Sequence, residues 1–187
     1  NPGKLGSHVM RSLIEGRFPG RIYPVNPGRD EILGIKAYPS LSQVPESIDL
    51  SIIVLPAEQV PKIIKECHEK GDKGIVLITA GFKEIEDKRG EELQLEIRRL
   101  ADRYGIKIIG PNTFGIANLH LPLNASFTPE FSLVEKGGIS FVSQSGGMSH
   151  LMGFLALQNR VGFSKIVGLG NRCNVDFAEM IEFLTKD

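Results

Sequence analysis

The sequence predicts an α/β fold in which helices cover both faces of a doubly wound, mostly parallel sheet. Short apolar runs alternate along the chain with stretches of helical periodicity, a pattern typical of βαβ units. Two of these runs, at residues 52–55 and 75–78, are apolar at every position, as expected of central strands that helices cover on both sides. The 187 residues suffice for one domain and part of a second.

The apolar runs place the strands in order along the chain. They fall at residues 21–25, 49–55, 74–79, 107–109, 138–142 and 165–168. Apolar positions spaced three and four apart predict a first helix around residues 9–14, a helix over 57–70 that Gly71 stops, and a helix over about 91–104 with Gly105 beyond its end. A closing helix follows at 177–184, and Asp176 with Glu179 three residues later predicts a capping box at its start.

A change of pattern predicts a domain boundary near Gly137 and Gly138. Residues 110–129, rich in proline and asparagine, interrupt the alternation, and a new strand and helix begin after the two glycines. We therefore expect one domain over residues 1–136 and the start of a second, incomplete domain over 137–187. Asn1 is not an initiator methionine, so we expect the chain to be part of a longer protein.

Charge and cysteine content argue against several classes of protein. The 22 basic and 22 acidic residues cancel, whereas a nucleic-acid-binding protein needs an excess of cations along one face. Cys67 and Cys173 stand far apart without the spacing of a zinc site or a disulfide framework, which favours the reducing cytoplasm. The longest uncharged stretch, residues 137–159, carries polar residues and several glycines, so we interpret it as strand, loop and helix and expect no membrane span.

Two segments near the N-terminus have the chemistry of an anion site. Ligands of doubly wound sheets bind where strands end and helices begin, because free backbone N–H groups and positive helix ends meet there. The first segment, at the start of the first helix, comprises Gly3, Lys4, Leu5, Gly6 and Ser7. Its glycines and its cation suit a pyrophosphate, but they are equally compatible with a glycine-rich turn that carries a solvated lysine. Arg29 follows Val25-Asn26-Pro27, where dinucleotide folds bind the ribose, and a cation there favours a phosphorylated ribose over a bare diol. A lone surface arginine without function remains the other interpretation.

A further anion-site candidate lies between an apolar strand and an apolar helix. It combines hydroxyls with glycines at a helix start, so N–H groups and the helix dipole would converge on an anion: Ser143, Gln144, Ser145, Gly146 and Gly147. Glycines in such a turn also occur simply for close packing. The order of residues excludes a GxSxG nucleophile elbow. His150 lies just past this loop, and we assign it no catalytic role.

Taken together, these loops resemble the CoA-binding alpha-type region of the nucleoside-diphosphate-forming acyl-CoA synthetases. That family includes ADP-forming acetyl-CoA synthetase and the succinyl-CoA synthetase alpha subunit. The resemblance covers nearly the whole chain and rests on seven motifs in one register: Pro2-Gly3-Lys4-Leu5-Gly6-Ser7, Tyr23-Pro24-Val25-Asn26-Pro27, Val54-Leu55-Pro56-Ala57, Thr79-Ala80-Gly81-Phe82-Lys83-Glu84, Gly110-Pro111-Asn112, Ser143-Gln144-Ser145-Gly146-Gly147, and Gly162-Phe163-Ser164 through Gly170-Asn171.

The resemblance implies a Rossmann-like CoA-binding domain followed by the start of a flavodoxin-like domain. It assigns the phosphates and adenosine of CoA to Gly3, Lys4, Leu5, Gly6, Ser7, Val25, Asn26 and Pro27, with Arg29 at the 3′-phosphate. It also places six residues beside the adenine and the pantetheine arm: Leu55, Pro56, Ala57, Ala80, Gly81 and Phe82. It adds Asn112 to the CoA site. It assigns a phosphate in transit to Ser143, Ser145, Gly146 and Gly147.

The resemblance also implies an acid–CoA ligase that couples acyl-CoA cleavage to NTP synthesis through an acyl phosphate and a phosphohistidine. ADP is the expected acceptor. An ATP-grasp beta-type subunit or fused domain would bind the nucleotide with Mg²⁺, and we expect an oligomer. Thr113 stands where the succinyl-type subunit has a cysteine, which leaves the acyl group open. The family's phosphohistidine segment lies beyond the point matching Asp187, so no catalytic residue is assigned, and we expect this chain alone to be inactive.

Two other functions fit parts of the same sequence. A non-catalytic CoA- or acyl-CoA-sensing module, fused to a domain such as an acetyltransferase, would share every loop and would differ only in lacking the downstream histidine. A dinucleotide-dependent oxidoreductase fits less well, because the chain has no GxGxxG fingerprint, and Asp30 comes five residues after Val25, beside Arg29, and does not close the strand.

Overall fold

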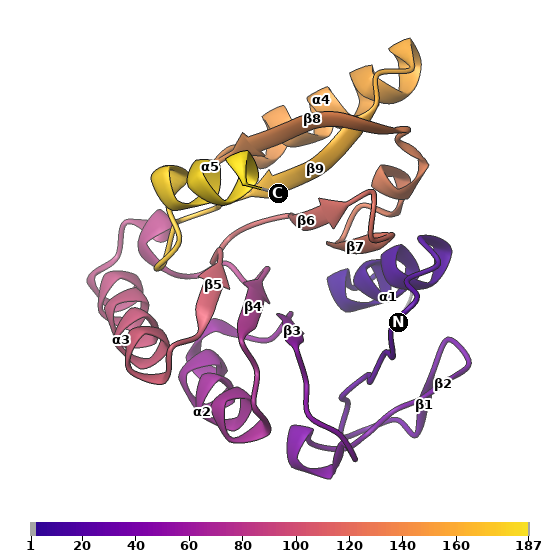
Figure 1. Ribbon diagram of the computed structural model, residues 1–187. Helices are drawn as coiled ribbons and strands as arrows, with labels where there is room; N and C mark the ends of the chain where they lie inside the picture. The colour runs from indigo at the N-terminus through magenta and orange to yellow at the C-terminus, as the bar shows by residue number, and fades with distance from the viewer. Residues whose placement is uncertain (1–2, 187) are drawn as a thin grey trace.

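Two sheets form the framework of the computed structural model, which describes residues 3–186 (Figure 1). The first is parallel, with the order β3-β4-β5: β3 (Leu50–Ile53), β4 (Gly74–Leu77) and β5 (Lys107–Ile109). The second has the order β7-β6-β9-β8: β6 (Gly115–Asn118), β7 (Leu123–Ser126), β8 (Lys136–Ser143) and β9 (Phe163–Gly168). β8 and β9 are parallel, and β6 is antiparallel to β7 and β9. The α/β class predicted from the sequence is confirmed.

Helices cover both faces of the first sheet, as predicted. α2 (Val60–Lys70) and α3 (Lys88–Tyr104) bury Ile64 and Ile97 against Ile75 of β4, whereas α1 (Leu5–Glu15) packs Val9 on the other face, against Val76. Neighbouring residues of a strand point to opposite faces, so an unbroken apolar run serves both layers. α4 (Gly146–Asn159) and α5 (Phe177–Thr185) pack on β8 and β9. Within residues 3–186, no helix has the length and apolar character needed to cross a membrane.

The helix boundaries follow the predicted stop and start signals. Gly71 and Gly105 end α2 and α3 in the left-handed conformation, with φ of 93° and 66°, where a side chain would be strained. Asp176 caps α5, because its carboxylate accepts a hydrogen bond from Glu179 N at 3.0 Å. The Glu179 carboxylate pairs with Lys107 of β5 at 2.7 Å, so its side chain is engaged outside the predicted capping box.

The predicted strand at residues 21–25 is wrong. The chain there makes one isolated bridge, between Val25 and Tyr38. Asn26 N donates to Tyr38 O and Tyr38 N donates to Pro24 O, both at 2.8 Å. Pro24 has no N–H and cannot extend a ladder. Among strands of the described residues, β3 therefore pairs only with β4, so β4 is central as predicted and the prediction of a central β3 is wrong.

The sequence pattern did not predict four short strands of the structure, β1, β2, β6 and β7. β6 and β7 lie inside the proline- and asparagine-rich stretch, and β1 (Glu31–Ile32) pairs with β2 (Ile35–Lys36) in a small hairpin. These strands have two to four residues each, too few to show a period of two. β6 precedes residue 136 in the chain, yet it pairs with β9, which follows it, so the second sheet draws strands from both sides of the predicted boundary. The boundary itself stays a prediction.

Asp72 is a buried carboxylate near the amino ends of the first sheet's strands. It is 3% exposed, and its Oδ2 accepts a hydrogen bond from the Ser51 hydroxyl of β3. Its Oδ1 has no hydrogen-bond partner among residues 3–186. Burial raises the pKa of Asp72 above the ordinary 3.8, and the hydrogen bond from Ser51 opposes that rise without cancelling it.

The raised pKa of Asp72 predicts how stability depends on pH. The folded chain holds this proton at a pH where the unfolded chain has lost it, so the contribution of Asp72 to stability is greatest below the ordinary pKa of 3.8 and falls as pH rises through the folded-state pKa. We expect the free energy of unfolding of the wild type to fall relative to Asp72→Asn as the pH rises from about 4 to about 7. Urea titrations across this range measure the difference, with Asp30→Asn, at an exposed carboxylate, as the control. A difference that does not change with pH would contradict the assignment.

Candidate functional site

The loops that follow β3, β4 and β5 contact one another. The Thr79 hydroxyl donates to Leu55 O at 2.7 Å and accepts from Leu55 N at 3.2 Å. Asn112 N donates to Thr79 O at 2.8 Å. A Cβ atom placed on Gly81 would lie 3.3 Å from the Cβ of Ala57. The predicted segments at residues 55–57, 80–82 and 112 therefore lie side by side, at the edge of the sheet where ligands of parallel sheets bind.

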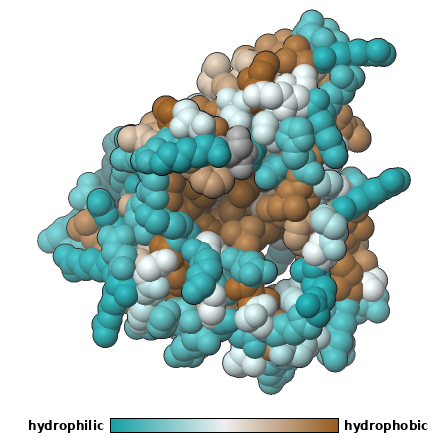
Figure 2. Space-filling model, viewed as in Figure 1, coloured by the Kyte–Doolittle hydropathy of each residue, from teal (hydrophilic) through white to brown (hydrophobic). Residues whose placement is uncertain are grey.

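Apolar surface is recessed near this edge. Figure 2 shows a hollow lined by hydrophobic residues at the centre of the face, at the position where Figure 1 draws the carboxyl ends of β4 and β5. Polar residues form its rim. An apolar recess with polar groups at its border is the common form of a small-molecule site.

Glu84 already occupies the backbone donors of the loop after β4. Its Oε1 accepts from Gly81 N at 2.5 Å and from Phe82 N at 3.2 Å, and its Oε2 accepts from the Asn171 side chain. These N–H groups therefore hold a carboxylate of the protein. The Phe82 side chain is 0% exposed, inside the core beside β4, so its ring offers no surface to a ligand and only its backbone can take part in the predicted site.

The loop after β9 fastens the second sheet to this edge. Asn171 N donates to Pro111 O and Cys173 N donates to Gly110 O, both at 2.8 Å. The Asn171 side chain also donates to Gln94 of α3 at 3.0 Å. Glu84 and Asn171 belonged to the motifs but not to the predicted site. A carboxylate three residues after a turn glycine is the signal that could have identified Glu84.

The loop after β8 forms the predicted helix start. Ser145 is the N-cap of α4, and its hydroxyl accepts from Met148 N at 3.3 Å. The Ser143 hydroxyl accepts from Ser145 N at 3.0 Å and tightens the turn. Gly146 and Gly147 occupy the first two helical positions, and a Cβ atom on Gly146 would have nothing within 4 Å. Packing therefore does not require glycine at 146, and open space lies beside this residue.

The two N-terminal segments are partly exposed, with Gly6, Ser7 and Asn26 half-buried. Lys4 is the N-cap of α1, and a Cβ atom on Gly3 or Gly6 would meet nothing within 4 Å, so packing does not require these glycines either. Asn26 Oδ1 accepts from Gly28 N at 2.9 Å and turns the chain before Arg29, which is exposed. Pro2 lies outside the described residues. The gathering of these segments with the other loops around one ligand stays a prediction.

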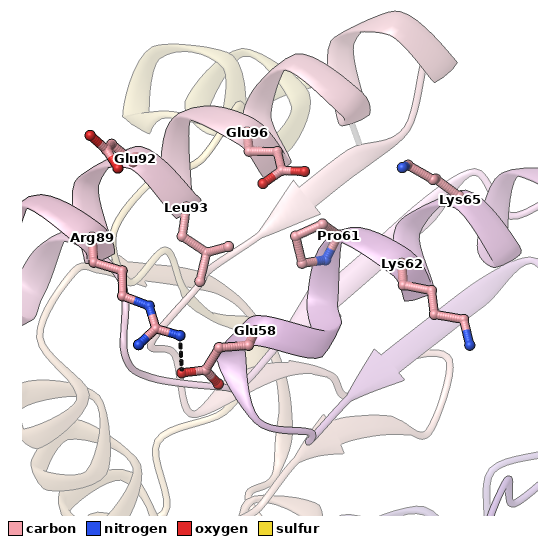
Figure 3. Close-up of a pocket in the computed structure, with 8 residues that line it drawn as sticks. All are labelled: Glu58, Pro61, Lys62, Lys65, Arg89, Glu92, Leu93 and Glu96. Atoms are coloured by element: carbon pink, nitrogen blue, oxygen red, sulfur yellow. Dashed lines mark ion pairs between the residues drawn. The ribbon is translucent and has the colours of Figure 1, made fainter.

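Another hollow lies between α2 and α3 and carries none of the predicted site residues. Figure 3 shows its lining of mixed charge, including the ion pair between Arg89 and Glu58 at 3.5 Å. The lining residues are Glu58, Pro61, Lys62, Lys65, Arg89, Glu92, Leu93 and Glu96. Acidic and basic side chains in similar number give this groove no preference for an anion. No group of three or more metal-ligating His, Cys, Asp or Glu side chains occurs over the described range 3–186.

The bonds around Glu84 predict an acid-sensitive loop. Partial burial raises the pKa of Glu84, but the bonds from Asn171, Gly81 and Phe82 outweigh it and lower the pKa below the ordinary 4.5. Because the folded-state pKa is lowered, the contribution to stability is present above pH 4.5 and is lost as pH falls through the lowered value. We expect Glu84→Gln to cost about 1–2 kcal/mol at neutral pH, measured by urea unfolding, and less in acid. The exposed Glu86→Gln is the control, and equal losses in both variants would contradict this role.

Comparison with known proteins identifies the family. A family model described as "CoA binding domain" matches residues 1–118, and one described as "Succinyl-CoA ligase like flavodoxin domain" matches residues 136–187. An ADP-forming acetate–CoA ligase of Methanocaldococcus jannaschii is 44% identical over 99% of this chain, which covers 25% of that protein. The alpha subunit of ADP-forming acetate–CoA ligase II of Pyrococcus furiosus is 41% identical over 98% of this chain, which covers 39% of the subunit.

A solved structure agrees with these sequence matches. The dinucleotide forming acetyl-coenzyme A synthetase 1 of Ca. Korarchaeum cryptofilum, in complex with phosphate and ADP, superposes with a TM-score of 0.93 at 38% identity. The match covers 100% of this chain and 39% of that one, so the chain spans well under half the length of such relatives. The resemblance predicted from the seven motifs is confirmed. The chain belongs to the CoA-binding domain family, and over nearly its whole length it is similar to the alpha-type region of the ADP-forming acetate–CoA ligases.

Proposed function

We propose that this chain is the CoA-binding part of an acid–CoA ligase that uses ADP as the phosphoryl acceptor. The observation that carries the proposal is the direct contact among the loops after β3, β4 and β5, which form one surface at the carboxyl edge of a parallel sheet. The CoA-binding domain model supports it, because its match spans all three loops. The complete protein interconverts acyl-CoA, ADP and phosphate with the free acid, CoA and ATP.

The proposed CoA site divides the coenzyme among the loops by chemistry. The pyrophosphate lies at the exposed start of α1, where glycines, a cation and the positive end of the helix meet: Gly3, Lys4, Leu5, Gly6 and Ser7. The adenosine lies against Val25, Asn26 and Pro27, with its 3′-phosphate on the Arg29 guanidinium. The adenine edge and the pantetheine arm follow the surface of Leu55, Pro56, Ala57, Ala80, Gly81 and Asn112, with the backbone of Phe82.

The proposed role of the α4 start is to stabilise a phosphate. In the reaction, a phosphate oxygen attacks the acyl carbonyl carbon and the CoA thiolate leaves, which gives an acyl phosphate. A histidine nitrogen outside this chain then takes the phosphoryl group and releases the carboxylate. Ser143, Ser145, Gly146 and Gly147 place hydroxyls and backbone N–H groups at a positive helix end, which suits the charge on the phosphoryl oxygens.

The remaining parts of the enzyme lie outside this chain. A beta-type ATP-grasp subunit or domain holds ADP with Mg²⁺ and accepts the phosphoryl group, and the complete enzyme is a cytoplasmic oligomer. The relatives named as alpha subunits support a partner of this kind. The chain alone binds CoA and does not turn over.

Calorimetric titration tests the assignment of CoA and of Arg29. We expect micromolar binding of CoA and weaker binding of dephospho-CoA and NAD. Because a guanidinium on a phosphate is a charge-assisted contact, Arg29→Gln should weaken CoA about tenfold and leave dephospho-CoA unchanged. Arg99→Gln, at an exposed arginine of α3, is the control and should change neither. CoA binding no tighter than dephospho-CoA or NAD would refute both the site and the role of Arg29.

A further inference from the structure

His150 holds the carbonyl at the start of α4. Its Nδ1 lies 2.7 Å from Gly146 O. A carbonyl oxygen only accepts hydrogen bonds, so Nδ1 carries a proton and donates it to Gly146 O. The other ring nitrogen, Nε2, lies 2.7 Å from the Thr128 hydroxyl. Both nitrogens are thus bonded, and the orientation of the ring is fixed.

Aromatic side chains enclose the His150 ring. Its centroid lies 5.7 Å from that of Phe114, 5.8 Å from that of Phe127 and 5.5 Å from that of Phe131. Phe154, one turn further along α4, lies at 6.4 Å. A ring packed in this way cannot turn away from Gly146 without losing contacts with several neighbours.

Thr128 ties this pair to a buried polar network on the second sheet. Thr128 is 4% exposed, and its N–H donates to the Ser126 hydroxyl at 3.0 Å. The Asn124 side chain of β7 donates to Thr128 O at 3.0 Å, and Asn124 Oδ1 accepts from the Ser126 hydroxyl at 2.6 Å. Satisfied networks of buried polar groups are rigid, so they form a firm anchor for what is bonded to them.

We propose that His150 is a positioning residue that orients the Gly147 N–H toward the phosphate at the start of α4. The carbonyl of Gly146 and the N–H of Gly147 share one planar peptide, so a hydrogen bond that fixes the carbonyl fixes the direction of the N–H. Gly146 and Gly147 have no side chains to restrict the first turn of α4, and the bond from His150 adds a side-chain restraint to that of the helix. The inference rests on the proposed phosphate role of residues 143–147 and adds to it a side chain from outside that loop.

Three variants separate the two bonds of His150 from its packing. His150→Phe keeps an aromatic ring and loses both bonds, and Thr128→Val removes only the bond to Nε2. His150→Asn keeps a donor for Gly146 O, because Asn159 in the same helix bonds in this way to Leu155 O, four residues back, at 2.8 Å. The amide signal of Gly147 in ¹⁵N-labelled chain and the dissociation constant of inorganic phosphate are measured for each, with CoA affinity and melting temperature as controls.

The positioning role predicts a specific ranking. His150→Phe should shift the Gly147 amide signal and weaken phosphate binding about tenfold, and Thr128→Val should weaken it about threefold. His150→Asn keeps the bond to Gly146 O but loses the bond to Thr128, so it should match Thr128→Val and not His150→Phe, all with CoA affinity unchanged. Wild-type phosphate affinity and an unmoved Gly147 signal in His150→Phe would overturn the inference alone. Losses of affinity that follow the melting temperature across the variants would also overturn it. A wild type that binds CoA but no phosphate would refute the phosphate role of the loop, and the inference with it.

Discussion

The Glu84 carboxylate joins the loop after β4, which belongs to the proposed CoA site, to the loop after β9. It binds the backbone N–H groups of the loop after β4 and the side chain of Asn171, which belongs to the loop after β9. Together with the backbone bonds of Asn171 to Pro111 O and of Cys173 to Gly110 O, this carboxylate holds the proposed CoA surface against the second sheet. Because the protein supplies this anion, the loop after β4 presents its residues to a ligand through shape and apolar contact, and the phosphates must bind elsewhere.

The helix starts are where the phosphates can bind. At α1 and at α4 the structure has glycines that packing does not require, at Gly3, Gly6 and Gly146. The segment from β7 to the turn after it contacts both helices. A Cβ atom on Gly16, at the end of α1, would lie 3.6 Å from the Asn124 side chain, and Thr128 bonds to His150 of α4. The helices proposed to hold CoA and phosphate thus share one support, which suits the proposed transfer of an acyl group from the CoA sulfur to phosphate.

Local chemistry explains which parts of the fold could be predicted from the sequence. The apolar runs of β3 and β4 and the stop signals at Gly71 and Gly105 depend on near neighbours in the chain, and the structure has them where the pattern placed them.

The error at residues 21–25 came from counting apolar residues without weighing the missing N–H of Pro24. β6 and β7 are held by pairing across the sheet, which short strands do not reveal in their own pattern. The resemblance places Phe82 beside the coenzyme, but a motif does not show which way a side chain points, and the structure buries this ring. The bonds of Glu84 to Asn171 and of His150 to Thr128 join residues distant in the chain, so only coordinates could show them.

We propose that the loops after the parallel strands bind one CoA molecule across the carboxyl edge of the first sheet. A crystal structure of this chain with CoA tests it most directly. We expect the pyrophosphate at Lys4 and the start of α1, the 3′-phosphate on Arg29, and the pantetheine arm along Leu55–Ala57 toward the start of α4. Coenzyme bound in the groove between α2 and α3, or bound without contact to Lys4 and Arg29, would contradict it.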